Sequence, residues 1–281
     1  MTRPDPGIIP SSDGMRLPDA LTIEYGPAPL LARFVLAADK AARKRGVLLR
    51  VRYDFEELVE INKFYVNKGQ WYPLLDAFNP QFSDLTPENA YWISGENEAG
   101  EIIATNVCRV LDWRRTNLAE QACSLWYGRD DGQECVVTAD AGRLISGVVA
   151  WGGAAWVRQD YRGKQLSYLT GRTHKAYACA RWPIDWSFCY IGIDNTRRGL
   201  ASTWGHSHLS YSISYPGSPH GEQVVAYSSA AEFYQDIAGF MDRGGVLESD
   251  DFDWSEVPIG LEHIVTRTSP DGVVQGSISR S

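Results

Sequence analysis

Residues 157–172 read VRQDYRGKQLSYLTGR, and this stretch decides the fold. A long apolar run from Ile145 to Val157 precedes it, which predicts a strand with a bulge at Gly152-Gly153. The spacing of apolar residues over 165–181 is that of an amphipathic helix. The sequence therefore predicts a strand, a short turn and a helix in direct succession.

The turn in this unit carries the features of an anion-binding site. The first backbone N–H groups of a helix have no partner within the helix, and the helix dipole favours negative charge there. Arg158, Arg162 and Lys164 add positive side chains around the same point. Residues 157–198 carry a net charge of +5 and the rest of the chain −13, although the chain as a whole is at −8. A basic patch of this kind attracts a small polyanion, and a pyrophosphate suits the turn.

The same residues resemble the acyl-CoA-binding motif of the GCN5-related N-acetyltransferase superfamily. The matching positions are Val157, Tyr161, Arg162, Gly163, Lys164 and Leu166. Gln165 stands where the family has its central Gly, so its side chain crowds a close backbone approach, and Ser167 stands where the family has Gly or Ala. The resemblance implies that acetyl-CoA or another acyl-CoA is the co-substrate. The implied binding residues are Trp156, Val157, Arg158, Arg162, Gly163, Lys164, Gln165, Leu166, Ser167 and Asn195.

The order of elements downstream is the one that the resemblance implies. A strand is expected at 186–193, a helix headed by Asn195 at 195–204, strands at 208–215 and 222–228, and a helix at 229–240. Family members splay the two strands that flank the cofactor arm. We therefore expect an α+β fold, with a mixed, largely antiparallel sheet flanked by helices and a helical N-terminal extension.

The segments outside this unit are expected to form three parts. A Pro-rich arm without regular helix spans 1–29, the acyltransferase domain spans 30–240 with its core at 89–228, and an extension with one strand at 259–267 spans 241–281. Within the domain, helices are expected at 30–45, from Asp54 to about Val66 behind a capping box, near 71–78 and at 116–127. Strands are expected at 47–53 and, as a hairpin, at 89–95 and 101–111.

The residues that would move protons are less clearly marked. In the family an amine attacks the thioester directly, and a backbone N–H on the bulged strand polarises the carbonyl. The run from Ile145 to Val157 offers no carboxylate as a base, and the helix from Asn195 lacks the Tyr that many relatives use as an acid. His206, with an ordinary pKa of roughly 6.5, is the first candidate. Tyr211 and Glu222 are the others.

Composition excludes several classes of protein. Of the 281 residues, 44% are hydrophobic and 12% aromatic, so the chain is globular, and its acidic total argues against a nucleic-acid partner. The five Cys have no metal-binding or disulfide-framework spacing, and no third ligand is fixed near His206 and His208. No metal is therefore expected. No stretch has the roughly 18 apolar residues of a membrane span, so the expected location is cytoplasmic, without a membrane.

These observations predict an acyl-CoA-dependent N-acyltransferase that transfers acetyl to a primary amine of a small molecule or peptide. The excess of acidic residues outside the motif slightly favours a cationic acceptor. Two alternatives stay open: a binding or regulatory module that has lost catalysis, and an acyltransferase with a longer acyl donor. The sequence leaves three options open for residues 1–88: a separate lobe, a cover over the acceptor site, or a surface for formation of a homodimer.

Overall fold

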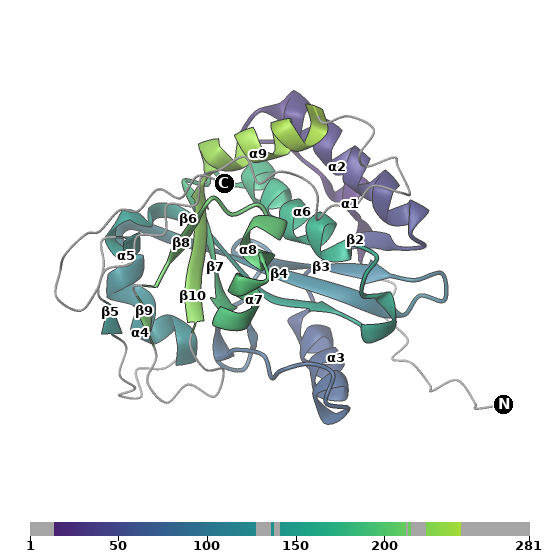
Figure 1. Cartoon of the computed structure of the whole chain (residues 1–281), viewed down its shortest axis with the longest axis horizontal. Coiled ribbons are helices and arrows are strands. Elements are labelled where there is room, and N and C mark those ends of the chain that lie inside the picture. The colour runs from purple at the N-terminus through teal and green to yellow at the C-terminus, as the bar shows by residue number, and fades with distance from the viewer. Residues whose placement is uncertain (1–13, 128–135, 138–140, 212, 215–222, 243–281) are drawn as a thin grey trace.

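The computed structural model describes residues 14–127, 136–137, 141–211, 213–214 and 223–242, and an eight-stranded sheet forms its centre (Figure 1). The strand order is β1-β2-β3-β4-β6-β7-β10-β8. Neighbouring strands run antiparallel except β6 and β7, which are parallel. The expected α+β class with a mixed, largely antiparallel sheet is confirmed.

The strands of the large sheet have the following bounds: β1 Met15–Arg16, β2 Leu48–Arg52, β3 Ala90–Glu96, β4 Ile102–Asn117, β6 Ser146–Val157, β7 Trp186–Gly192, β8 His208–Ser210 and β10 Gln223–Ser229. Two further strands, β5 Val136–Val137 and β9 Ile213–Ser214, pair with each other. The helices are α1 Leu17–Ala20, α2 Ala28–Lys44, α3 Phe55–Asn67, α4 Leu118–Tyr127, α5 Ala141–Leu144, α6 Leu166–Arg181, α7 Ile193–Arg197, α8 Leu200–Thr203 and α9 Ala230–Asp242, with 3-10 turns η1 Asp76–Phe78 and η2 Gln159–Tyr161.

Most of these elements begin and end close to where the sequence predicts them. Gly46, with φ of +70°, follows the end of α2, as expected. The backbone N–H of Glu57 donates to Asp54 Oδ1 at 3.0 Å, which caps α3. The carboxylate of Glu57 forms an ion pair with Arg52 at 2.8 Å.

Four expectations are corrected. Residues 17–20 form one helical turn within the Pro-rich arm, with Pro18 in that turn. Near 71–78 only the 3-10 turn η1 forms, and the helix expected at 195–204 is two short helices separated at Gly199, with φ of +77°. The strand expected at 208–215 is divided between β8 and β9, which belong to different sheets. The strand expected at 259–267 lies outside the described residues.

Two apolar cores lie on opposite faces of the sheet, because successive side chains of a strand point to opposite sides. In β3, Tyr91 and Ile93 pack with α2, α6 and α9, whereas Trp92 packs with α3 and η1. Figure 1 places α2, α6 and α9 above the sheet and α3 below it. The N-terminal helix α2 is therefore part of the main core.

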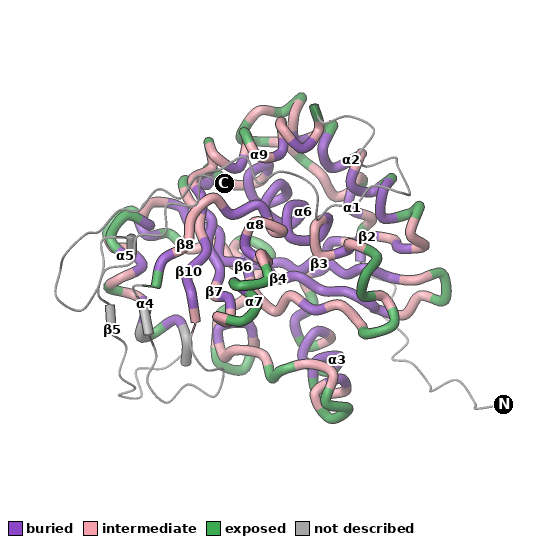
Figure 2. Tube along the Cα trace, viewed as in Figure 1, coloured by how far each residue is buried: buried purple, intermediate pink, exposed green. Residues whose placement is uncertain are grey.

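Helix α6 lies at the centre of the molecule. Of its 16 residues 13 are buried, and Figure 2 shows it enclosed along most of its length. Its polar residues join it to neighbouring elements: Arg172 forms two hydrogen bonds of 2.8 and 3.0 Å with Asp236 of α9, and Lys175 donates to the carbonyl of Gly205 at 2.6 Å. This buried helix holds its own N-terminus in a fixed position.

Candidate active site

Strands β6 and β7 separate part of the way along their length. Their parallel pairing runs from Val149 opposite Trp186 to Gly152 opposite Cys189 and ends there. Beyond that point β6 continues to Val157 beside β4, and β7 continues to Gly192 beside β10. Among the described strands, no pairing joins the two edges that face each other across this opening. The splay that the family resemblance implies is present.

The bulge in β6 lies beyond the two glycines that suggested it. Thr105 of β4 is opposite Trp156 and Val107 is opposite Gly153, so Ala154 and Ala155 together stand opposite Asn106. Ala154 has φ of +47°, a left-handed conformation. The glycines instead permit close packing, because a Cβ on Gly152 would lie 2.8 Å from His174 Nε2 and one on Gly153 would overlap the ring of Phe78.

The turn between β6 and α6 contains two left-handed residues. Gly163 has φ of +81° and Gln165, the residue before the helix, has φ of +58°. Gln165 thus adopts the conformation that a Gly adopts more easily. A side chain from the N-terminal segment contacts it: Arg45 Nε donates to the carbonyl of Lys164 at 3.0 Å, and its Nη2 lies 3.5 Å from Gln165 Oε1. Arg45 is 119 residues from Lys164 in sequence.

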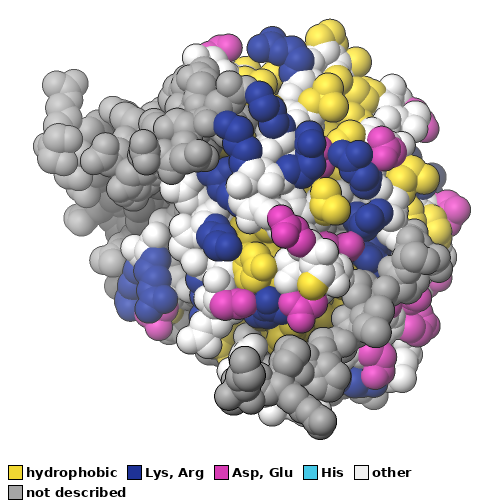
Figure 3. All heavy atoms as spheres, turned by 90° about the vertical axis from the view of Figure 1, so that its right-hand side faces the viewer, with side chains coloured by type: hydrophobic (Ala, Val, Ile, Leu, Met, Phe, Trp, Pro, Cys, Tyr) yellow, Lys and Arg dark blue, Asp and Glu magenta, His cyan; other side chains and the backbone are white. Residues whose placement is uncertain are grey.

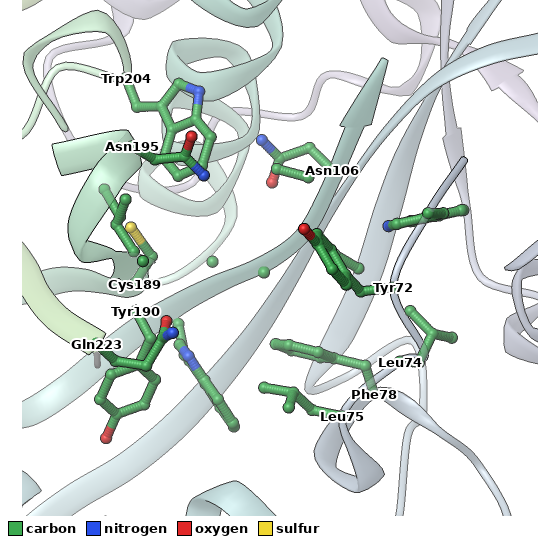
Figure 4. Close-up of a pocket in the computed structure, with 18 of the residues that line it drawn as sticks. Tyr72, Leu74, Leu75, Phe78, Asn106, Cys189, Tyr190, Asn195, Trp204 and Gln223 are labelled. Atoms are coloured by element: carbon green, nitrogen blue, oxygen red, sulfur yellow. The ribbon is translucent and has the colours of Figure 1, made fainter. Parts of the chain in front are cut away.

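Two adjoining cavities follow the opening. The outer chamber, of about 790 Å³, lies against the turn and the start of α6. The inner chamber, of about 590 Å³, lies where the strands separate (Figure 4). Both chambers share the same six residues, so together they form one continuous cleft. These shared residues are Trp71, Tyr72, Ala155, Asn195, Arg198 and Trp204.

Most of the residues expected to bind the co-substrate line the outer chamber. They are Trp156, Val157, Arg162, Gly163, Gln165, Leu166, Ser167 and Asn195. Two expected residues do not line either chamber. Arg158 is held by Glu101 at 3.0 Å and Asp160 at 2.7 Å, and Lys164 places its ammonium 4.3 Å from the centre of the Tyr161 ring.

The ion pairs of Arg158 are reflected in the titration of its partners. Hydrogen bonds from Asn97 and Arg158 hold the pKa of Glu101 below its ordinary value. A hydrogen bond from Arg158 likewise lowers the pKa of Asp160. The guanidinium of Arg158 thus has a structural role at the end of β6.

The three candidate proton-transfer residues lie in different parts of the protein relative to the cleft, or outside the described residues. His206 lines the inner chamber and is buried, with its Nε2 3.3 Å from Cys189 Sγ. Tyr211 is 45% exposed and lines neither chamber. Glu222 lies outside the described residues. Of the two candidates that the structure describes, His206 lies in the cleft and Tyr211 does not.

Three polar side chains meet where β6 and β7 separate. His174 of α6 lines the inner chamber together with Cys189 and His206. Its Nδ1 lies 3.2 Å from the carbonyl of Thr170. Since a carbonyl only accepts, Nδ1 carries the proton and Nε2 of His174 keeps its lone pair. Within the described part of the chain, His206 Nδ1 is a buried atom without a hydrogen-bond partner.

Burial keeps all three groups uncharged. It lowers the pKa of His174 to about 3, with a further contribution from the positive charge of Lys175. The same two causes hold the pKa of His206 well below 6.5. Burial raises the pKa of Cys189 to about 12 and lowers that of Lys175 to about 7. Neutral imidazoles and a neutral thiol therefore face the inner chamber.

One wall of the cleft is a loop that the sequence predicted as a helix. Trp71 stacks on Trp156 with ring centres 4.9 Å apart, and the indole N–H of Trp156 donates to the carbonyl of Gln70 at 3.0 Å. Asn62 of α3 fixes the next residues, because its Nδ2 donates to the carbonyl of Tyr72 at 2.8 Å and its Oδ1 accepts from Leu74 N at 3.1 Å. These bonds satisfy backbone groups of the loop without a helix and fix the position of this wall.

Sequence reasoning missed several residues of the cleft. Trp71, Tyr72, Asn106, His174 and Arg198 were not among the expected site residues, and all of them line at least one chamber. No local motif marks them.

Residues 157–198 contribute less positive charge to the cleft than their net charge of +5 suggests. Arg158, Arg172 and Lys175 are bound within the protein. The outer chamber is lined by Arg162 and Arg198 and by no Asp or Glu among the described residues, whereas Asp194 and Arg198 offset each other in the inner chamber. Figure 3 shows Lys and Arg gathered on the upper half of the face that carries the right-hand end of the sheet in Figure 1. Positive charge thus remains in the outer chamber.

Two further properties bear on what the protein can bind. Within the ranges that the structure covers, no three His, Cys, Asp or Glu side chains gather as a metal site would require. No helix there combines the length and apolar character needed to cross a bilayer.

Comparisons with other proteins give similarity at the level of structure only. No protein-family model and no curated protein matches the chain. Arabidopsis thaliana NAA60 in complex with acetyl-CoA is 10% identical, with a TM-score of 0.42 over 66% of this chain and 99% of that one. FeeM, an N-acyl amino acid synthase from uncultured soil microbes, is 14% identical with a TM-score of 0.42 over 70% and 98%. The aminoglycoside acetyltransferase AAC(6')-Ib, with coenzyme A and kanamycin, is 17% identical with a TM-score of 0.36 over 67% and 98%.

Because these TM-scores are below 0.5, the assignment of a function rests on the cleft itself. The strand, turn, helix and strand of residues 146–192 stand in the order that the resemblance to the N-acetyltransferase superfamily implies.

Proposed function

We propose that the protein is an acyl-CoA-dependent N-acyltransferase that transfers an acetyl group to a primary amine. One observation carries the proposal: a single cleft joins the N-terminus of α6 to the opening between β6 and β7. The first of these features suits a pyrophosphate, and the second places the facing edges of two separated strands beside a thioester. A long donor with an anionic end and a reactive end fits both.

The outer chamber is proposed to hold the phosphates. Arg162 donates from Nε to the carbonyl of Val157 at 3.2 Å, which leaves its terminal nitrogens to face the chamber. Arg198 lies on the opposite side of the chamber, between α7 and α8. The N–H groups at the start of α6 complete a cradle of donors around an anion.

The inner chamber is proposed to hold the reacting atoms. The reaction moves the acyl group from sulfur to nitrogen, and the proton that leaves the amine ends on the sulfur. The backbone N–H groups of the bulge at Ala154-Ala155 would polarise the carbonyl. His174 Nε2 would accept a hydrogen bond from the attacking amine, and the Cys189–His206 pair would donate to the departing sulfur.

Calorimetric titration with acetyl-CoA, followed by detection of free thiol with a panel of amines, tests the proposal. Arg162→Ala should raise the Kd for acetyl-CoA about tenfold, since a charge-assisted contact to phosphate contributes about 1.5 kcal/mol or more. Arg115→Ala is the matched control, because Arg115 is exposed on β4 and lines neither chamber.

The outcomes distinguish an acetyltransferase from a binding module without catalysis and from an acyltransferase with a longer acyl donor. Absence of binding at millimolar acetyl-CoA would refute the proposal. Binding without thiol release from any amine would instead identify a binding module that has lost catalysis. Turnover only with longer acyl-CoA would show that the acetyl group is the wrong donor.

A further inference from the structure

The inner chamber, of about 590 Å³, has more volume than an acetyl thioester and an attacking amine group need. One of its walls is apolar. Leu74, Leu75, Phe78 and Trp151 form that wall, with Tyr72 at its edge (Figure 4). The polar side chains His174, Cys189 and His206 stand at the opposite end, where the strands separate. The chamber thus has a reactive end and an apolar end.

The charges around the chamber disfavour a second positive charge on its occupant. Asp194 is the one carboxylate among the described lining residues, and it is exposed and lies 3.4 Å from Arg197. Arg198 adds a positive side chain to the same lining. A dication placed here would find no unshared carboxylate among these residues.

The apolar wall reaches the molecular surface at Tyr72 and Pro73, which are both exposed, and Pro73 lines the inner chamber alone. Tyr72 is 76% exposed although it is a large aromatic residue, and it lies on a loop fixed by Asn62. An exposed aromatic side chain at the edge of a cavity is a feature of sites that take apolar ligands. Because the donor occupies the outer chamber in the proposed function, a second substrate needs such an entrance.

We infer that the acceptor is a monoamine with an apolar or aromatic body, which packs against the wall from Tyr72 to Phe78 and places its amine at the reactive end. This inference rests on the proposed function and names its substrate class. It narrows the cationic acceptor favoured by the excess of acidic residues outside the motif to one with a single positive charge, because Asp194 is the one carboxylate among the described residues that line this chamber.

The test compares pairs of amines that differ in one property. With saturating acetyl-CoA, kcat/KM is measured for hexylamine against 1,6-diaminohexane, which has the same chain with a second charge, and for 2-phenylethylamine against spermidine. We expect at least a tenfold preference for the monoamine in each pair. An equal or higher value for the diamine or for spermidine would overturn the inference.

A charge introduced at the rim tests the same point without enlarging the core. With acetyl-CoA kept saturating for each variant, Tyr72→Asp should lower kcat/KM for hexylamine and raise that for 1,6-diaminohexane, so that the preference falls at least fivefold. Tyr25→Asp is the control, since Tyr25 is 43% exposed and lines neither chamber. A preference that Tyr72→Asp leaves unchanged would contradict the placement of the acceptor.

Two further results separate this inference from the proposed function. A kcat/KM for octanoyl-CoA more than tenfold above that for acetyl-CoA, together with no preference among amines, would assign the apolar wall to the acyl chain. That result would overturn the inference about the acceptor but not the acyl-CoA-dependent transfer itself. Failure of acetyl-CoA to bind would overturn both. Calorimetric titration of hexylamine into the protein–CoA complex provides a readout independent of turnover. The titration reaches a hexylamine concentration about ten times its measured KM, which is roughly saturating for one site. Absence of binding at that concentration would count against the inference.

Discussion

Arg45 is predicted to hold the turn between β6 and α6 in the shape that the proposed donor site requires. Gln165 adopts φ of +58°, and a left-handed conformation costs a residue with a side chain about 1 kcal/mol relative to Gly. Arg45 offsets this cost through its bonds to Lys164 O at 3.0 Å and Gln165 Oε1 at 3.5 Å. Since these bonds are near the surface and one is long, we assign them about 1 kcal/mol together.

Removal of these bonds should therefore weaken the binding of acetyl-CoA by about fivefold, the factor that corresponds to about 1 kcal/mol. Arg45→Ala is the perturbation, and calorimetry of acetyl-CoA binding is the assay. Arg33→Ala, an exposed position on α2 that lines neither chamber, should have no effect. Because a positioning residue acts on the donor alone, the KM for acetyl-CoA should rise while kcat at saturation stays within twofold.

The double variant gives the decisive result. In a Gln165→Gly background the left-handed conformation needs no support and the bond to Oε1 is gone, so Arg45→Ala should weaken binding by twofold or less. Arg45→Lys in the natural background should recover part of the affinity, because it keeps the charge. If Arg45→Ala costs the same fivefold in both backgrounds, the reasoning about Gln165 is refuted.

Three further predictions concern stability and the division of roles. Gly153→Ala should lower the free energy of unfolding by about 2 kcal/mol or more, because its Cβ overlaps the ring of Phe78, and denaturant titration measures the loss. Arg158→Gln should lower the melting temperature but leave the Kd of acetyl-CoA within twofold; a Kd raised tenfold would return Arg158 to the binding site. Acidification should destabilise the fold: the pKa of His174 is depressed to about 3 and that of His206 also lies below 6.5, so the unfolded chain binds more protons and the free energy of unfolding falls as the pH drops below 6.5. The slope should reach about 3 kcal/mol per pH unit for two such groups and become shallower in His174→Gln, as measured by denaturant titration at several pH values.

The parts of the fold that were predictable from the sequence are those set by neighbouring residues. Strand β6, the turn and α6 follow from apolar spacing and from Gly163, and the cap of α3 follows from Asp54. These features depend on residues a few positions apart. The same is true of the β3–β4 hairpin.

The parts that could not be predicted depend on contacts between distant residues. The segment near 71–78 has helix-forming residues, but Asn62 satisfies its backbone from another element. Arg172 counted toward a basic patch until Asp236, 64 residues away in sequence, neutralised it in the fold. The position of the bulge depends on the register between β4 and β6, which no local pattern records.

The six residues shared by the two chambers have a thermodynamic consequence. A molecule in the outer chamber touches Trp71, Tyr72 and Trp204, and the same side chains form part of the surface that an occupant of the inner chamber would meet. The two binding equilibria are therefore coupled. By linkage, whatever factor the first ligand applies to the Kd of the second, the second applies to the Kd of the first. In the proposed function, occupancy of either chamber therefore changes the affinity of the other chamber by the same factor.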